Sequence, residues 1–79
     1  MFYTQDILEE LNVLVRYNLD TTLEGIKVHA SVADVDVVAA TRRLFEKGLI
    51  TQVDGGYLTT MGHEAAEHAH AVLHLLQPA

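Results

Sequence analysis

Apolar residues of the N-terminal segment fall at positions i, i+1, i+4, i+7 and i+8, so they share one face of a helix. Those residues are Ile7, Leu8, Leu11, Leu14 and Val15. Thr4 can accept a hydrogen bond from the first turn, and Asp6 suits the positive end of the helix dipole. The pattern predicts a helix over residues 5–17. Its opposite, solvated side is predicted to carry Glu9, Glu10, Asn12 and Arg16.

The same periodicity predicts two further helices. Asp34 can cap the first of them, which runs to about Lys47. Its inner face is predicted to hold Val37, Val38, Thr41, Leu44 and Phe45. On or near its outer face are Asp36, Ala39, Ala40, Arg43 and Lys47. The last helix runs from about Thr60 to Leu76 and ends before Pro78. Its inner stripe is rich in small residues and comprises Gly62, Ala65, Ala66, Ala69, Leu73 and Leu76.

A short hairpin is predicted between these two helices. Gly48 suits the left-handed position that closes a helix, and residues 49–53 then have the character of a strand. The glycines of Asp54-Gly55-Gly56 supply the positive φ angles of a tight reversal, after which Tyr57-Leu58-Thr59 returns. Helix, hairpin and helix therefore follow one another in the order of a recognition helix, a β-wing and a trailing helix.

The segment between the first two helices leaves two alternatives open. A short helix over residues 22–30, capped by Thr22, is the favoured prediction. The β-branched Ile26 and Val28 weaken that helix and favour instead a short strand over residues 26–28, placed against the wing.

The length and hydrophobic content indicate one globular domain, residues 1–79, with a small core. Its hydrophobic fraction is 49%. A chain of this size buries only about 60% of its unfolded surface, so dimerisation is a plausible source of further stability. The residues predicted to be mostly buried are Ile7, Leu11, Leu14, Val38, Leu44, Phe45, Leu49, Leu58, Ala66 and Leu73.

The residue types that are missing exclude several classes of protein. The chain has no cysteine, which removes disulfides, zinc ribbons and thiol catalysis and fits a reducing cytosol. No apolar run approaches the ~20 residues of a membrane span, and the N-terminus lacks the basic start of a signal peptide. Neither a Gly-rich phosphate loop nor a catalytic triad pattern is present. We therefore expect a cytoplasmic protein that is not an enzyme, holds no cofactor and does not enter a membrane.

Three short motifs resemble winged helix-turn-helix regulators of the MarR-like and PadR-like kind. They are Lys47-Gly48-Leu49-Ile50, Asp54-Gly55-Gly56 and Tyr57-Leu58-Thr59. Residues 22–34 can be laid over the helix and turn that precede a recognition helix. Over nearly its full length the chain also looks like a small, uncharacterised bacterial family catalogued as hypothetical DNA-binding proteins. The segments that carry this resemblance are Thr21-Thr22 and residues 25–29, 47–52, 54–59 and 65–69. The resemblance implies a mostly α fold with a small β-wing, an α+β winged helix-turn-helix.

If the chain binds double-stranded DNA, the resemblance and the charge pattern point to four cations. These nucleic-acid-binding candidates are Lys27, Arg42, Arg43 and Lys47. The net charge of −6 and the neighbouring acids Asp34, Asp36 and Glu46 oppose that function. The alternative interpretation is a solvated face, in which Arg42 pairs with Glu46 four residues later.

Two features of the last helix raise further hypotheses. His63, Glu67, His70 and His74 are spaced by four, three and four residues, so they share one side and are candidates for a metal site or a pH switch. A polar flank on which histidine is merely tolerated is the favoured alternative, and no metal is expected. The broad apolar end, Val72 to Leu76, favours a homodimer through this C-terminal helix.

Two functions of different classes follow. DNA binding, as in a transcriptional regulator that contacts DNA with the helix over residues 34–47, is placed first because of the resemblance. A protein-interaction module that keeps the wing but has no DNA affinity is the alternative, because of the charge. A metal or pH sensor is a minor third alternative.

Overall fold

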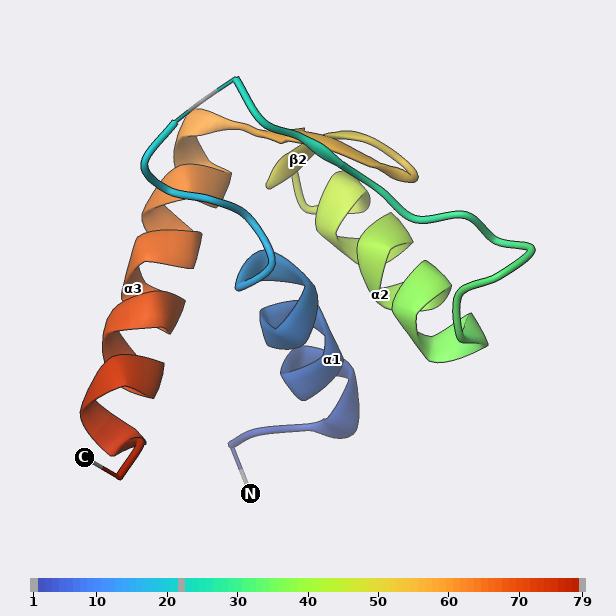
Figure 1. Cartoon of the computed structure of the whole chain (residues 1–79). Helices are drawn as coiled ribbons and strands as arrows, with labels where there is room; N and C mark the ends of the chain where they lie inside the picture. The colour runs from blue at the N-terminus through green and yellow to red at the C-terminus, as the bar shows by residue number, and fades with distance from the viewer. Residues whose placement is uncertain (1, 22, 79) are drawn as a thin grey trace.

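Three helices and a small antiparallel sheet make up a mixed α+β domain. The computed structural model describes residues 2–21 and 23–78. Its elements in chain order are α1 (Gln5–Leu14), β1 (Ile26–Lys27), α2 (Val35–Glu46), β2 (Ile50–Gln52), β3 (Gly55–Leu58) and α3 (Thr60–Leu76). The three helices lie on one side of the sheet, which crosses their upper ends in Figure 1.

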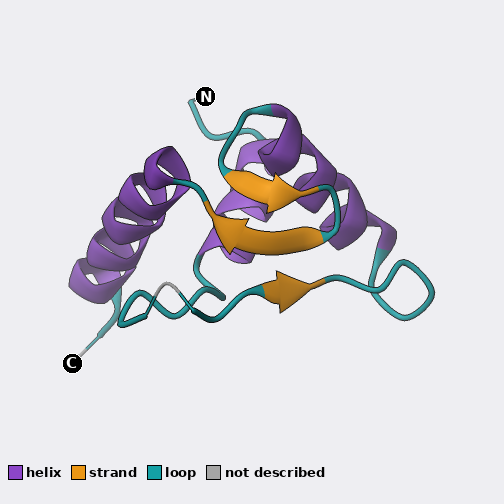
Figure 2. Cartoon of the chain, turned by 90° about the horizontal axis from the view of Figure 1, so that it is seen from above, coloured by secondary structure: helices purple, strands orange, loops and turns teal. Residues whose placement is uncertain are grey.

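The sheet has the strand order β1-β3-β2, so the hairpin strand β3 is central (Figure 2). In β1, Ile26 pairs with Gly56 and Lys27 pairs with Gly55. In β2, Ile50 pairs with Leu58. The first strand comes from the segment between α1 and α2, so the sheet ties that segment to the hairpin.

The favoured prediction of a helix over residues 22–30 is wrong, and the alternative strand is correct. Thr22 lies outside the described residues. The strand covers Ile26 and Lys27, and directly after it the Val28 N–H donates to the Asp54 carbonyl at 2.8 Å. Between this strand and α2, the only helical feature in the described chain is one turn in which the Ala33 N–H donates to the His29 carbonyl at 2.9 Å. No separate helix precedes α2 within residues 23–34.

The predicted bounds of α1 extend one turn too far, whereas those of α2 and α3 are confirmed. Beyond Leu14 the backbone tightens, because the Tyr17 N–H donates to the Leu14 carbonyl only three residues earlier. Thr4 caps α1 as predicted, and its hydroxyl accepts from the Ile7 N–H at 3.2 Å. Thr59 caps α3 in the same way, accepting from the Gly62 N–H at 3.0 Å.

The hairpin forms as predicted but reverses earlier. Its turn falls at Val53 and Asp54, and β3 already begins at Gly55. Gly55 and Gly56 adopt φ angles of 131° and 71°, which confirms the need for positive φ at this pair. Because both glycines lie within the strand, they bring the β1 backbone close on one side and β2 close on the other.

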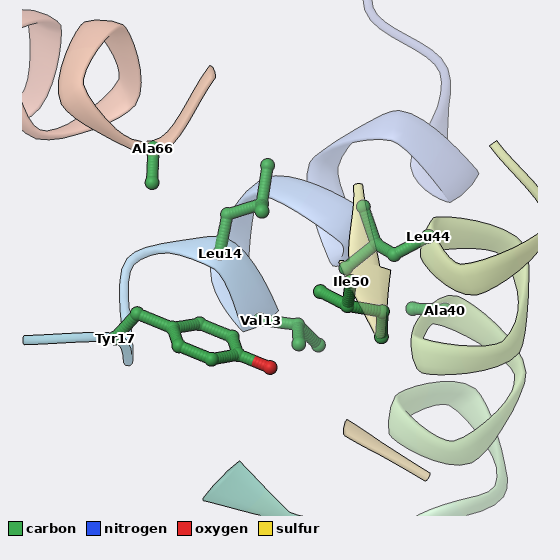
Figure 3. Packing of buried hydrophobic residues seen from close by; sticks show 7 residues of the cluster. All are labelled: Val13, Leu14, Tyr17, Ala40, Leu44, Ile50 and Ala66. Carbon is green, nitrogen blue, oxygen red and sulfur yellow. The ribbon is translucent and has the colours of Figure 1, made fainter. Parts of the chain in front are cut away.

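The core lies where the three helices meet the sheet (Figure 3). Its cluster of buried residues comprises Val13, Leu14, Tyr17, Ala40, Leu44, Ile50 and Ala66. The predicted burial of Leu14, Leu44 and Ala66 is confirmed. Leu11, Val38, Leu49 and Leu58 are half-buried.

Three residues predicted to be buried are exposed, namely Ile7, Phe45 and Leu73. The buried residues of α1 are instead Glu10, Val13 and Leu14, and Tyr17 is buried just after the helix, so the buried stripe is rotated from the predicted one. On α2, Ala40, predicted on the outer side, is fully buried in the core, and Phe45 is exposed. The predicted inner face of α2 is therefore right at Thr41, Leu44 and Val37, which packs against the core, and wrong at Phe45.

Candidate functional site

The four cations predicted to contact DNA do not form one patch. Arg43 and Lys47 face α1 and pair with Glu10 there. Lys27 pairs with Asp54 at the hairpin turn. Arg42 has no ion pair among the residues that the structure describes. The cations therefore lie in three separate environments, and two of them, the half-buried Arg43 and the exposed Lys47, point toward α1.

The buried carboxylate of Glu10 pairs with both Arg43 and Lys47. Glu10 is only 5% exposed. Its Oε2 accepts a hydrogen bond from Arg43 Nε at 2.8 Å, and its Oε1 accepts from Lys47 Nζ. Asp6 and Glu9 each place a carboxylate oxygen 3.8 Å from Arg43 Nη2, which surrounds this guanidinium with negative charge.

This arrangement overturns three placements made from the sequence. Arg43 and Lys47 lie on the side of α2 that faces α1, not on the outer face. Glu10 is buried, not solvated. Helical spacing explains the burial of Glu10, because it lies three and four residues before Val13 and Leu14 on the buried side of α1. The sequence does carry a signal for this cluster. It is an apolar stripe that starts at a carboxylate and faces a helix with two cations four residues apart.

The electrostatics of the cluster favour its charged form. Burial raises the pKa of the Glu10 carboxyl, but the hydrogen bonds from Lys47 and Arg43 outweigh burial and hold that pKa below its ordinary value. The hydrogen bond to Glu10 likewise raises the pKa of the Arg43 guanidinium. Glu10 is therefore ionised at neutral pH, and it neutralises charge that a phosphate would otherwise meet.

Lys27 takes part in a weaker, surface ion pair. Its Nζ lies 3.5 Å from Asp54 Oδ2, and both side chains are substantially exposed. Pairs of this kind contribute about 0–1 kcal/mol and are screened by salt. The contact nevertheless offsets the charge of Lys27 at the tip of the hairpin.

The remaining cation, Arg42, borders a small hollow between α2, the end of β1 and the hairpin turn. The hollow has a volume of about 150 Å³, and Val28, Val38, Thr41 and Val53 are among the residues that line it. Val35 lies two turns before Arg42 on the same side of α2, and Ala39 lies between them; both are exposed. We call Val35, Val38, Ala39, Arg42 and Val53 the Arg42 face. These five side chains are apolar except for the Arg42 guanidinium, and Asp54, which pairs with Lys27, also lines the hollow.

Of the four candidate residues on α3, His63 and Glu67 form one close pair in the described chain, and the four do not come together as a metal site. His63 Nδ1 lies 2.8 Å from Glu67 Oε1, which matches the predicted spacing of four residues. His70 is half-buried, and its Nε2 has no hydrogen-bond partner in the described chain, while His74 is exposed. Within residues 2–21 and 23–78, no group of three or more His, Asp or Glu side chains is arranged to hold a metal ion.

A larger hollow that the sequence did not reveal lies between the end of α1, the loop after it and the start of α3. Its volume is about 470 Å³. Glu24, Glu64 and Glu67 border it, and so does Tyr17. Burial raises the pKa of Tyr17 to about 12, and its hydroxyl donates to the Gly56 carbonyl at 3.2 Å. Tyr17 therefore links the end of α1 to the central strand.

Comparison with known proteins places the chain in a family without a known activity. The sequence profile of a family of unknown function, DUF5669, matches residues 1–77, and the chain belongs to this family. No curated protein and no solved structure matches it. In the described part of the chain, none of the helices has the length and apolar character that crossing a membrane requires.

Proposed function

We propose that this DUF5669 member is a protein-interaction module on a winged-helix scaffold and that the Arg42 face is its contact surface. The observation that carries the proposal is the distribution of charge on α2. Glu10 pairs with Arg43 and Lys47 on the side of α2 that faces α1, whereas the exposed Val35 and Ala39 lie beside Arg42, which has no ion pair in the described chain.

The order of the elements supports the winged-helix scaffold. One strand lies between α1 and α2, α2 runs directly into a hairpin, and the strand order is β1-β3-β2. A further helix, α3, follows the wing. The departure is the single turn at residues 29–33, which stands where the first helix of a helix-turn-helix pair is expected.

The charges of α2 oppose contact with phosphates. Asp34 and Asp36 stand at the N-terminal end of this helix, the end that enters the major groove in helix-turn-helix proteins, and Glu46 stands at the other end. All three residues are exposed, whereas Arg42 is the one exposed cation of this helix without an ion pair in the described chain. Affinity for DNA comes largely from neutralised phosphates, so a face with this balance supplies little of it.

The Arg42 face fits instead a protein segment that carries an apolar side chain next to a carboxylate. The apolar side chain would enter the hollow lined by Val28, Val38 and Val53, and the carboxylate would accept hydrogen bonds from the Arg42 guanidinium. An arginine beside an apolar pocket is typical of the residues that dominate binding energy at protein interfaces.

Selection from a random peptide library tests this proposal. Peptides enriched on the wild-type protein should combine an apolar residue with Asp or Glu. Arg42→Glu should raise the Kd of an enriched peptide at least tenfold, because it replaces the attractive charge with a repulsive one. Arg16→Glu is the matched control, since Arg16 is also exposed and lacks an ion pair in the described chain but does not border the hollow. Enriched peptides that bind Arg42→Glu as tightly as the wild type would contradict the proposal.

DNA binding remains the second candidate because one observation favours it. The helix α2 precedes the hairpin in the same order as a recognition helix precedes a wing. In that function Arg42 and Lys27 would supply the phosphate contacts, since Arg43 and Lys47 are held by Glu10.

A further inference from the structure

The contact between α1 and α3 is confined to part of each helix. The two helices meet in the core, where Leu14 and Ala66 are both buried (Figure 3). From there they spread apart toward the N-terminal end of α1 and the C-terminal end of α3 (Figure 1). Ile7 lies two turns before Leu14 on the same face, and Leu73 lies two turns after Ala66. These two residues are 39% and 41% exposed, although their periodicity predicts burial.

The end of α3 is apolar and uncovered. Every residue from 71 to 78 is exposed. Leu75 and Leu76 are 80% and 76% exposed, and Val72 is also largely exposed. We call Ile7, Leu8, Leu73, Leu75 and Leu76 the α1–α3 surface. It lies on elements other than those of the Arg42 face.

The exposed area of the chain exceeds that of a compact monomer. A folded monomer of 8.7 kDa is expected to expose about 4,700 Å². This chain exposes 5667 Å², which is roughly 900 Å² more. A stable interface of standard size buries about 800 Å² on each partner. The excess is therefore about the area that one protomer contributes to a dimer.

The charge of the α1–α3 surface allows two copies to meet. Residues 68–79 include no Asp, Glu, Lys or Arg, although the whole chain carries a net charge of −6. This uncharged part of the surface on α3 escapes the repulsion that opposes contact between two acidic chains elsewhere on the surface. It also offers no charged group that would select a basic or an acidic partner, whereas a two-fold contact requires only that the patch complement itself.

We infer that a second copy of this chain packs on the α1–α3 surface and forms a two-fold homodimer. In this dimer, the end of α3 from each protomer covers Ile7 and Leu73 of the other. The contact buries Ile7 and Leu73, the apolar residues that a single copy leaves exposed. The inference is independent of the function proposed for the Arg42 face, because the two surfaces share no residue.

Sedimentation velocity tests the dimer. The wild-type protein at about 50 μM should sediment with the mass of two chains. The double variant Leu75→Glu, Leu76→Glu should sediment as a single chain of 8.7 kDa. Because both leucines are largely exposed, the fold of one protomer does not depend on them, and circular dichroism should show unchanged helicity. Ile7→Glu, on the other helix, should also dissociate the dimer.

Val32→Glu is the matched control, since Val32 is as exposed as Leu75 but precedes α2. It should leave the mass unchanged, and so should Arg42→Glu, which separates this result from the test of the Arg42 face. A single-chain mass for the wild type at every concentration would overturn the inference. So would a double variant that keeps the mass of two chains.

Discussion

Gly62→Ala should destabilise the domain by at least about 3 kcal/mol, although alanine in a helix is ordinarily preferred to glycine by about 0.8–1.0 kcal/mol. A Cβ atom at position 62 would lie 1.8 Å from the Leu49 carbonyl oxygen and 2.7 Å from its carbon. The Leu49 backbone cannot move aside easily, because its N–H donates to Leu44 and its carbonyl accepts from Thr59. The first turn of α3 must therefore move away from Leu49, the residue that precedes β2.

Urea denaturation followed by circular dichroism measures this effect. Ala71→Gly is the control, because Ala71 lies in the same helix and is exposed. It should cost only about 1 kcal/mol, the propensity difference alone. A Gly62→Ala variant as stable as the wild type would show that α3 does not approach Leu49 as closely as described.

Leu44→Ala should lower the free energy of unfolding by about 2–5 kcal/mol, which is a large fraction of the stability of a domain of this size. Leu44 is 1% exposed and packs among residues from all three helices and β2. Its truncation removes buried methyl groups and leaves a cavity that the surrounding helices and β2 cannot close. The same denaturation experiment provides the measurement.

Phe45→Ala, at the next position, tests whether burial or side-chain size determines the loss of stability on truncation. Phe45 is the larger side chain, but it is exposed on α2. Its truncation should therefore cost less than that of Leu44. If Phe45→Ala proved the more destabilising substitution, α2 would face the core with a different side.

The elements predicted correctly from the sequence are those whose signals are local. Thr59 supplies its hydroxyl to the first turn of α3, and Gly55 and Gly56 permit the hairpin backbone. The segment over residues 22–30 has no such local determinant. Its strand exists because Ile26 and Lys27 pair with β3, which lies about thirty residues later. Single-sequence propensity cannot show a partner at that distance.

The candidate site was misjudged for the same reason. From the sequence, the cations of α2 were weighed against acids on the same helix, such as Glu46 four residues after Arg42. The carboxylate that holds Arg43 and Lys47 is Glu10, on another helix. A charged residue inside an apolar stripe is a signal of such pairing, because a buried charge requires an opposite partner. Applied to α1, that rule singles out Glu10.

The proposal that the Arg42 face contacts protein and not DNA is tested most directly by titrating the wild-type protein against a random 30-base-pair duplex and following fluorescence anisotropy. At 50 mM salt we expect no saturable binding up to about 100 μM protein, because Arg42 and Lys27 are a poor substitute for the several phosphate contacts that give non-specific Kd values of about 10⁻⁴–10⁻⁶ M. Binding that weakens steeply between 50 and 200 mM salt, and that Arg42→Ala abolishes, would contradict the claim and assign the Arg42 face to DNA.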